Sequence, residues 1–367
     1  MRRLARRPWR RQENTASAGN CVGVSGSIAT RPPPGRSGMA LSNRDIIVIG
    51  ASAGGVEALR VLVAGLAPDL AASMFVVLHL WPNGKSHLAP ILERAGSLPV
   101  LVGTDGAPIQ RGKIYVAPVD QHMMIGEGKL VVARGPRENR ARPAINPLFR
   151  SAAYVGRSRV IGVILSGTLD DGTAGLWAVK HCGGVCVVQS DAAFEDMPRS
   201  ARENVAIDHN VPLVEIAPLL NRLVGDRSDA SPSAPAAEVV QLNEETARME
   251  PPGFNGDEVG RRPLFTCPEC HGALWELDKG LIDYRCHVGH AYSAEALQTA
   301  QNAAIEGALR GALRALKESA ALDQQIAERS AAKNRVGAEA ASRRRASVKM
   351  EQAAQLQEFL ASLRAKK

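Results

Sequence analysis

The stretch "IIVIGASAGGVEAL" (residues 46–59) runs from branched apolar residues through a glycine-rich turn into a helical pattern. A buried strand that leads through such a turn into a helix is typical of the first unit of a parallel α/β sheet. The turn allows two interpretations. Gly50, Ser52 and Gly55 match a G-x-G-x-x-G phosphate loop whose middle glycine is replaced, whereas residues 50–54 match a G-x-S-x-G turn that presents Ser52 as a nucleophile.

Further apolar runs alternate with helical patterns as far as residue 225. They read "MFVVLHL", "LPVLVG", "GKIYVAP", "KLVVARG", "VIGVILSG" and "GGVCVVQ". Several are apolar throughout, as in strands that are covered on both faces. We therefore predict an α/β domain with a doubly wound, mostly parallel, Rossmann-like sheet, in which "GKIYVAP" and "GKLVVARG" form an antiparallel excursion.

The remaining chain predicts four further segments. Residues 1–43 are rich in arginine, proline and glycine, and the first 38 supply +7 of the net charge of +8. We interpret these 38 residues as a disordered tail, a transit segment or, preferably, an upstream extension before a start at Met39. A Ser/Pro/Ala-rich linker (residues 226–262), a cysteine module (263–292) and a helical tail (293–367) follow the domain at 44–225.

Charge and hydropathy exclude two function classes. Outside the first 38 residues the chain is close to neutral, which argues against nucleic-acid binding. The N-terminal stretch has no apolar run long enough for a signal peptide or a membrane anchor. We therefore expect a cytoplasmic protein without membrane insertion.

The residue that ends the second predicted strand decides between the two interpretations of the turn. A dinucleotide loop usually has a carboxylate there to bind the ribose, but this strand ends in His79. Asp170 and Asp171 follow the strand "VIGVILSG". Ser52, His79 and Asp171 thus lie at the carboxyl ends of three predicted strands, which meet at one sheet edge and predict a Ser-His-Asp triad.

Each of these residues also has a simpler explanation. Ser52 is a suitable helix N-cap, His79 a suitable core histidine, and Asp171 before Gly172 a suitable turn residue. Their coincidence at one edge favours the triad. We choose Asp171 over Asp170 because Gly172 lets the turn bring its carboxylate back over the sheet, and Asp170 stays an alternative. The order Ser, His, Asp differs from that of α/β-hydrolases.

Several motifs resemble, in order and spacing, the catalytic domain of the chemotaxis protein-glutamate methylesterase family, CheB. They are "IGASAGGVEAL", "VVLHLWPNGKSHLAPIL", "GKIYVAPVDQHM", "RPAINPLFRSAA", "GVILSGTLDDGTAGL" and "MPRSARENVAIDHNVP", within about residues 45–220. The resemblance implies hydrolysis of glutamate γ-methyl esters on chemoreceptor helices, with release of methanol, and deamidation of certain glutamines. It implies catalysis by Ser52, His79 and Asp171 without a cofactor.

Three positions depart from the family pattern. Ala53 stands where a threonine is usual, Thr168-Leu169 alters a loop thought to bind the oxyanion, and Asn146 stands where an aspartate is common. The residues before the domain are too few for the usual receiver domain. A non-catalytic signalling scaffold with the same fold is therefore the alternative function, and a nucleotide-binding protein is the third.

The cysteine module has ligand spacing typical of zinc. Cys267-x-x-Cys270 is followed after fifteen residues by Cys286-x-x-x-His290, and His287 competes with His290 as the fourth ligand. Covalent haem at Cys267-x-x-Cys270-His271 and a redox dithiol are the alternatives. We expect a structural zinc ion in a zinc-ribbon-like module.

The tail after the module is rich in helix formers and lacks proline. We expect one or two long helices with a break near "KNRVGAEA". Because alanine dominates the apolar positions, a coiled coil and a solvated helix fit about equally well. The module and tail are expected to dock receptor or kinase helices. The partners expected for the chain are a methylated chemoreceptor-like helical protein and a sensor kinase or methyltransferase.

Overall fold

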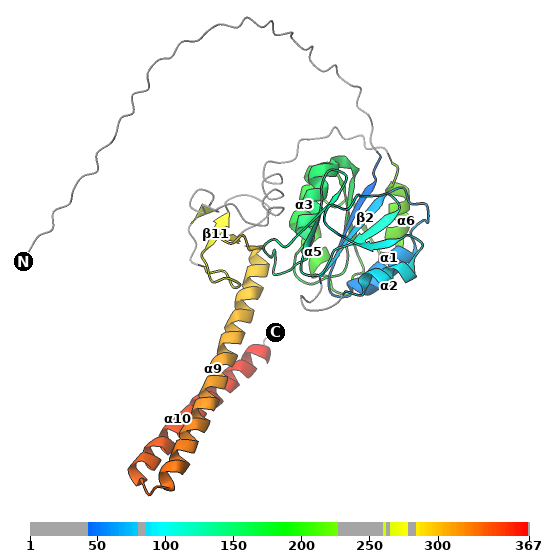
Figure 1. Cartoon of the computed structure of the whole chain (residues 1–367). Helices are drawn as coiled ribbons and strands as arrows, with labels where there is room; N and C mark the ends of the chain where they lie inside the picture. Colours follow the sequence, from blue (N-terminus) through cyan, green and yellow to red (C-terminus); the bar gives the residue numbers. More distant parts are fainter. Residues whose placement is uncertain (1–42, 80–85, 227–259, 262–264, 278–283, 366–367) are drawn as a thin grey trace, which may run out of the picture. The chain divides into compact units, whose positions relative to one another are not determined.

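The computed structural model describes residues 43–79, 86–226, 260–261, 265–277 and 284–365. The basic N-terminal stretch and nearly all of the predicted linker lie outside these residues. The described chain contains an α/β domain, a small β module and two long helices (Figure 1).

Seven parallel strands form the main sheet, in the order β3-β4-β2-β1-β7-β8-β9. They are β1 (Ile46–Ala51), β2 (Ser73–Leu78), β3 (Val100–Val102), β4 (Lys113–Val116), β7 (Val160–Ile164), β8 (Val185–Gln189) and β9 (His209–Val211). The strand order reverses between β1 and β7, and such a switch point opens a crevice at the carboxyl edge of a sheet. The doubly wound fold is confirmed.

Helices cover both faces of this sheet (Figure 1). One face carries α1 (Gly55–Ala64), α2 (Leu88–Ala95) and α6 (Leu213–Leu223); the other carries α3 (Ile145–Gly156), α4 (Thr173–His181) and α5 (Asp196–Asn204), with a 3-10 turn at Arg157–Arg159. Ile47 and Ile49 of β1 pack into the first core, and Ile46 and Val48 pack into the second. Burial on both faces explains why the strand sequences are apolar throughout.

The sequence prediction is wrong about one strand of the antiparallel excursion. β4, which carries "KIYV", is a parallel strand between β2 and β3. The strand that pairs antiparallel with β6 (Leu130–Ala133) is β5 (His122–Ile125). β4 is almost fully buried between two neighbours, so its apolar side chains match the main sheet and not a two-stranded excursion.

The C-terminal region begins with a four-stranded antiparallel sheet. Its strands are β10 (Gly260–Arg261), β11 (Leu274–Leu277), β12 (Tyr284–Cys286) and β13 (Ala291–Tyr292). We call residues 265–292, as far as they are described, the cysteine module. β10 lies inside the stretch that the sequence predicts as a linker.

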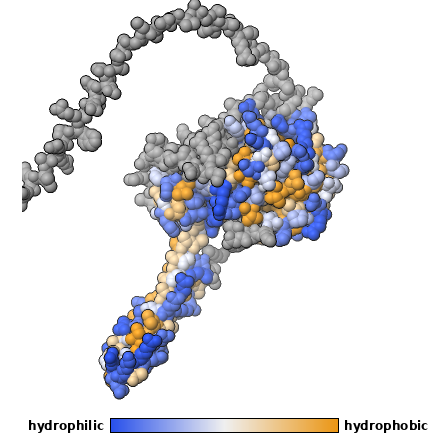
Figure 2. All heavy atoms as spheres, in the orientation of Figure 1, coloured by the Kyte–Doolittle hydropathy of each residue, from blue (hydrophilic) through white to orange (hydrophobic). Residues whose placement is uncertain are grey.

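Two helices follow the cysteine module, α9 (Ala294–Ala331) and α10 (Val336–Ala365). Ser293 is the N-cap of α9 and accepts a hydrogen bond from the Ala296 N–H at 3.1 Å. The helices pack antiparallel through small side chains and share polar contacts such as Lys349 with Asp323, with alanines buried along the seam (Ala320, Ala327, Ala346 and Ala353). Figure 2 shows polar and apolar residues interspersed along this pair. Within the described chain, no helix has the length and apolar character needed to cross a membrane.

Candidate active site and metal site

The serine turn joins β1 to α1 in a close bend. Ser52 follows β1, and Gly54 has a φ of 72°, a conformation that favours glycine. A Cβ atom at Gly54 would lie 2.9 Å from the Ser166 Oγ, so close packing also requires glycine. The Ser166 carbonyl accepts from the Ser52 N–H at 2.9 Å, and its hydroxyl donates to the Ala53 carbonyl at 2.8 Å. The end of β7 thus fixes Ser52 at the carboxyl edge of the sheet.

His79 lies directly after β2 and reaches both other candidate residues. Its Nδ1 lies 3.2 Å from the Ser52 Oγ, and its Nε2 lies 2.8 Å from the Asp171 Oδ2. A carboxylate only accepts hydrogen bonds, so Nε2 carries the hydrogen in this arrangement and Nδ1 presents its lone pair to the serine hydroxyl. The His79 side chain is 20% exposed and that of Asp171 only 2%. The imidazole is therefore accessible while its carboxylate partner is shielded from water.

Asp171 is buried in a setting that keeps it charged. Burial raises its pKa, but the hydrogen bond and charge of His79, with the backbone N–H groups of Ile145 and Asn146, outweigh burial and lower it. The Ile145 N–H lies 2.7 Å from Oδ2 at the start of α3, where the helix dipole favours a negative charge. The Asn139 Nδ2 donates to Oδ1 at 3.4 Å. Asp171 is thus held from three directions.

Asp170, the alternative carboxylate, has a different environment. Among the described contacts none joins it to His79, and its buried Oδ1 has no hydrogen-bond partner in the described part of the chain. Burial, followed by the charge of Asp171, raises the pKa of Asp170 to about 6, against a hydrogen bond with the Ser293 side chain. The structure therefore brings Asp171, and not Asp170, against the imidazole.

The loop between β7 and Asp170 packs directly on the serine turn. A Cβ atom at Gly167 would lie 3.0 Å from the Ser52 Cβ and 2.1 Å from the Met197 Sδ, so a larger residue here would have to displace the Met197 side chain. Leu169 has a φ of 64°, a strained conformation for a residue with a branched side chain. Thr168 and Leu169 both line the cleft beside Ser52. Strain of this kind is typical of a functional loop.

Asn146 performs a structural task at the position where the family often has aspartate. Its Oδ1 accepts from the Gly172 N–H at 3.0 Å and from the Gly175 N–H at 2.7 Å. These groups are the free donors at the start of α4, immediately after Asp171. An amide oxygen can accept both bonds, so this substitution leaves the support of Asp171 intact.

A cleft of about 920 Å³ opens beside Ser52 and His79. One side carries three arginines, of which Arg137 pairs with Glu269 at 3.5 Å and Arg142 pairs with Asp120 at 2.8 Å. The third, Arg140, is exposed and has no ion pair among the described residues. The C-terminal region supplies another side through Pro268, Glu269 and three alanines of α9 (Ala300, Ala303 and Ala304). Residues from both ends of the described chain thus surround the serine.

The cysteine module gathers four ligand atoms in one place. Those of Cys267, Cys270, Cys286 and His290 all lie within 4.8 Å of one another. The Cys270 Sγ and Cys286 Sγ are 3.6 Å apart, and the His290 Nδ1 lies 3.5 Å from the Cys286 Sγ. Zinc–sulfur bonds of about 2.3 Å place tetrahedral sulfur ligands about 3.8 Å apart, so these residues fit a zinc ion.

The surroundings of the cluster distinguish its two candidate histidines. The His287 ring packs over Gly272, where a Cβ atom would lie 2.2 Å from its Cε1. His290 directs Nδ1 into the cluster, while its Nε2 lies 3.6 Å from the Glu269 carboxylate. A carboxylate beside the free nitrogen is the usual support of a metal-bound histidine. His290, and not His287, thus places a ring nitrogen among the three cysteine sulfur atoms.

Sequence reasoning did not predict the contribution of Arg137, Asn139, Arg140 and Glu269 to the cleft. Arg137, Asn139 and Arg140 belong to the irregular segment "PRENRARP", which has no hydrophobic period or recognisable motif. Glu269 lies between two predicted metal ligands, where its only visible role was that of a spacer. The one available signal was the asparagine at position 139, because asparagine is enriched in the left-handed region, where the structure places Asn139 with a φ of 48°.

The fold and the site define the class of the protein: an α/β protein in which serine, histidine and aspartate side chains, the residue types of a serine-hydrolase triad, are aligned at the carboxyl edge of a doubly wound sheet. The sequence profile of the family described as CheB methylesterase matches residues 47–220. A putative protein-glutamate methylesterase/protein-glutamine glutaminase of Leptospira interrogans is 35% identical over 184 residues, which are 49% of this chain and 95% of that protein. The chain belongs to the CheB methylesterase family.

Two further comparisons cover the same region. The protein-glutamate methylesterase/protein-glutamine glutaminase 2 of Anaeromyxobacter dehalogenans is 36% identical over 181 residues, 49% of this chain and 53% of that one. The chain thus spans about half the length of this relative. The crystal structure of the Thermotoga maritima CheB methylesterase catalytic domain shares 31% identity, covers 50% of this chain and all of the other, and has a TM-score of 0.48.

Proposed function

We propose that the chain hydrolyses γ-methyl esters of glutamate side chains in a protein substrate, with Ser52 as the nucleophile. The observation that carries the proposal is the continuous row from the Ser52 Oγ through the His79 ring to the Asp171 carboxylate, with contacts of 3.2 and 2.8 Å. Family membership supports the reaction type. A non-catalytic scaffold would have no need of a charged, buried Asp171 behind the imidazole.

In the first half of the reaction, the His79 Nδ1 takes the proton of the Ser52 hydroxyl as Oγ attacks the ester carbonyl carbon. Asp171 holds the ring in the required tautomer and stabilises the imidazolium that forms. His79 then gives the proton to the leaving methoxide, so methanol departs and an acyl ester remains on Ser52. In the second half, His79 takes a proton from water, which attacks that ester, and then gives the proton to the departing Ser52 Oγ, so the glutamate carboxyl group is released and the Ser52 hydroxyl and neutral His79 are restored.

The tetrahedral intermediates of both halves carry a negatively charged oxygen. Ala53 and Gly54 lie between Ser52 and the start of α1, and their backbone N–H groups have no acceptor among the described residues. Such groups at the N-terminal end of a helix are suited to an oxyanion. We assign them, with the backbone around Thr168, as the donors. Ala53 supplies this N–H as well as threonine would. The same steps with ammonia as the leaving group convert glutamine to glutamate.

The substrate follows from the cleft and from the family resemblance. Exposed Arg140, with Arg137 and Arg142 beside it, favours an acidic segment around the reacting side chain. We therefore propose a methylated, glutamate-rich helical protein of the chemoreceptor type, acted on in the cytoplasm. Sensor kinase and methyltransferase partners of the C-terminal helices stay predictions from the resemblance.

The cysteine module is proposed to hold a structural zinc ion through Cys267, Cys270, Cys286 and His290. Three thiolates and one imidazole fill all four tetrahedral positions, so no position is open for substrate or water. The ester hydrolysis itself is carried by the chain's own side chains, and the ion would stabilise the fold of the small module.

Methanol release from receptor fragments with methylated glutamates tests the proposed reaction. The full chain is expected to release methanol, and the glutamine form of the same fragments to release ammonia. Ser52→Ala is expected to abolish both, while Ser97→Ala, an exposed serine outside the site, leaves them unchanged. Full activity of Ser52→Ala would show that another group attacks the ester.

A further inference from the structure

The segment 137–142 connects the catalytic domain to the cysteine module. It contains two consecutive left-handed residues, Asn139 with a φ of 48° and Arg140 with a φ of 66°. Glu138 anchors the segment to the domain through two hydrogen bonds of 2.7 Å from the buried Arg150 guanidinium. A conformation with two such residues costs free energy and persists only where its surroundings fix it.

The cysteine module fixes the other side of this segment. The Asn139 N–H donates to the Ala291 carbonyl at 2.9 Å, and the Ala291 N–H donates to the Arg137 carbonyl at 3.3 Å. The segment therefore lies alongside β13, in parallel register at Glu138 and Ala291. Ala291 directly follows His290, so the metal-ligand cluster and this pairing share one short piece of backbone.

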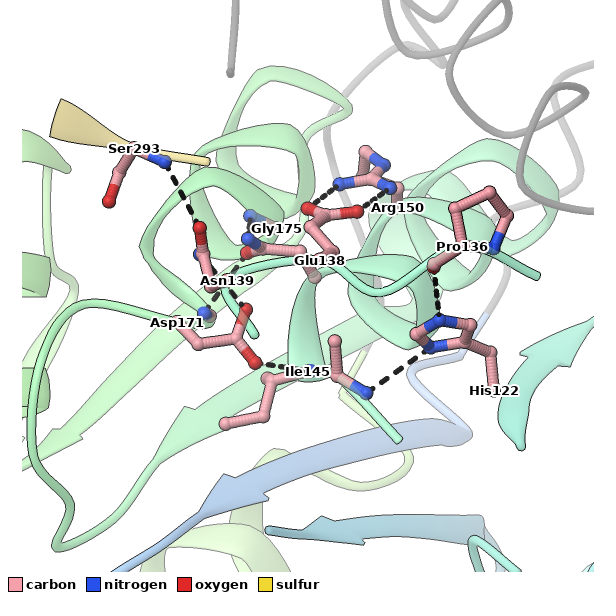
Figure 3. A network of polar contacts seen from close by, with 12 residues as sticks. His122, Pro136, Glu138, Asn139, Ile145, Arg150, Asp171, Gly175 and Ser293 are labelled. Atoms are coloured by element: carbon pink, nitrogen blue, oxygen red, sulfur yellow. Dashed lines mark hydrogen bonds and ion pairs between the residues drawn. The ribbon is translucent and has the colours of Figure 1, made fainter. Parts of the chain in front are cut away.

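The side chain of Asn139 completes the connection in the opposite direction. Its Oδ1 accepts from the Ser293 N–H at 3.0 Å, immediately before α9, and its Nδ2 donates to the Asp171 Oδ1 at 3.4 Å. Figure 3 shows Asn139 between Ser293 and Asp171, with Glu138 and Arg150 to the right. One amide thus contacts both the C-terminal region and the carboxylate that orients His79.

We propose that Asn139 is a positioning residue through which the cysteine module orients Asp171. The Ser293 N–H holds the amide oxygen, which directs Nδ2 toward Asp171 and leaves Oδ2 for His79 and the Ile145 N–H. This inference rests on the proposed role of the triad and extends it: the C-terminal region is part of the catalytic machinery as well as a wall of the cleft.

The test uses the full chain and a serine-reactive phosphonate, so that it needs no identified substrate. The rate constant for labelling of Ser52 reports how well His79 and Asp171 activate the serine. Asn139→Ala removes both side-chain bonds, and loss of one long hydrogen bond to a carboxylate is expected to slow labelling about three- to tenfold. Asn334, with a φ of 53° in the turn between α9 and α10, provides the matched control Asn334→Ala, which should label at the wild-type rate.

Asn139→Asp separates positioning from a merely structural role. Aspartate also tolerates the left-handed conformation and can still accept from the Ser293 N–H, but in its ionised form it cannot donate to Asp171. The added negative charge makes the His79 imidazolium more stable. When the labelling rate constant of Ser52 is measured against pH, it falls on the acid side as His79 becomes protonated. The midpoint of this fall is therefore expected to shift upward by about half a pH unit or more in Asn139→Asp.

The other titratable residues near Asp171 are not substituted in this variant. They are His79, Asp170 and the buried His122, whose ring lies between the Pro136 carbonyl and the Ala144 N–H. An unshifted profile for Asn139→Asp, matching that of Asn334→Asp, would overturn the assignment.

The contribution of the module is tested by combining variants. Cys286→Ser disrupts the ligand cluster and is expected to slow labelling in the wild-type background but to add little in the Asn139→Ala background, because both changes break one connection. Cys182→Ser, a buried cysteine in the catalytic domain, is the control. If Cys286→Ser slows labelling by the same factor in the wild-type and Asn139→Ala backgrounds, the two changes act independently, which would contradict the coupling.

A chain that labels normally at Ser52 but releases no methanol would contradict the proposed substrate and leave the positioning role standing.

Discussion

At the scale of single residues, the site depends on a buried carboxylate that stays charged. Asp171 reaches this state because His79 and two backbone N–H groups offset the effect of burial on its pKa. For Asp170, one residue earlier, burial and the charge of Asp171 outweigh the hydrogen bond with the Ser293 side chain, and its pKa is raised to about 6. Adjacent carboxylates in the same loop thus have opposite pKa shifts, and each shift has a measurable consequence.

The first consequence concerns the rate. Asp171→Asn keeps the shape of the side chain but removes the charge that stabilises the imidazolium, and its amide can hold the wrong tautomer of His79. We expect kcat for methanol release to fall by about a thousandfold or more, with a smaller change in KM. Thermal unfolding should show a folded protein. A loss below tenfold would mean that Asp171 does not orient the base.

The second consequence concerns stability as a function of pH. The pKa of Asp170 rises from 3.8 to about 6 on folding, so between these values the folded chain holds a proton that the unfolded chain has released. Stability from this group is therefore lost as the pH rises from about 4 to about 6, by up to about 3 kcal/mol. Asp170→Asn is expected to raise the free energy of unfolding at pH 7.5 and to have little effect at pH 4. An equal effect at both values would contradict this account.

At the scale of elements, the carboxyl ends of β2, β1 and β7 lie side by side in the sheet. His79 follows β2, Ser52 follows β1, and Asp171 lies in the loop after β7. The starts of α3 and α4 use their first N–H groups within the site: the Ile145 N–H binds the Asp171 carboxylate, and the Gly172 and Gly175 N–H groups bind the Asn146 amide oxygen. Asn146 ties these two helices together, from the first turn of α3 to the first turn of α4. The active site is therefore also a junction of helix ends.

Removal of the Asn146 side chain tests this junction. Asn146→Ala leaves the Gly172 and Gly175 N–H groups without their acceptor in a buried place, at an expected cost of about 1 to 3 kcal/mol in the free energy of unfolding. Asn146→Asp keeps both contacts, so its free energy of unfolding should fall by less than that of Asn146→Ala. Urea unfolding with the two variants side by side measures the difference, and equal stability of all three proteins would argue against the junction.

The sequence predicted these elements where hydrophobic patterning is strong. The apolar runs at β1, β2, β7 and β8 are buried on both faces, and that burial is what the sequence pattern records. β9 (His209–Val211) was not predicted because three residues with a polar centre form no apolar run. β4 was placed beside the wrong strand because periodicity shows burial but not the neighbouring strand.

At the scale of the whole molecule, the C-terminal region contributes to the site from far along the chain. The contact between Ser293 and Asn139 joins residues 154 positions apart, and Glu269 faces the cleft from between two predicted ligands. Ligand spacing was enough to predict the cysteine cluster because its chemistry is local. It could not predict which surface the module covers, because that depends on tertiary packing between segments that share no motif.

Metal content tests the module directly. The purified full chain is expected to carry about one zinc ion, since the proposed ligand set is three thiolates and one imidazole. Cys286→Ser should lose the ion, and Cys182→Ser should retain it. Elemental analysis with thermal unfolding measures both, and unchanged zinc in Cys286→Ser would exclude the cluster as the binding site.

Labelling combined with methanol release tests the central claim, that Ser52 is the nucleophile of a methylesterase. The full chain is treated with a serine-reactive phosphonate, digested and examined by mass spectrometry, while methanol release from methylated receptor fragments is followed in parallel. We predict an adduct on the peptide of residues 45–60, loss of methanol release in step with labelling, and neither adduct nor release in Ser52→Ala. Undiminished methanol release by the fully labelled chain or by Ser52→Ala would contradict the account.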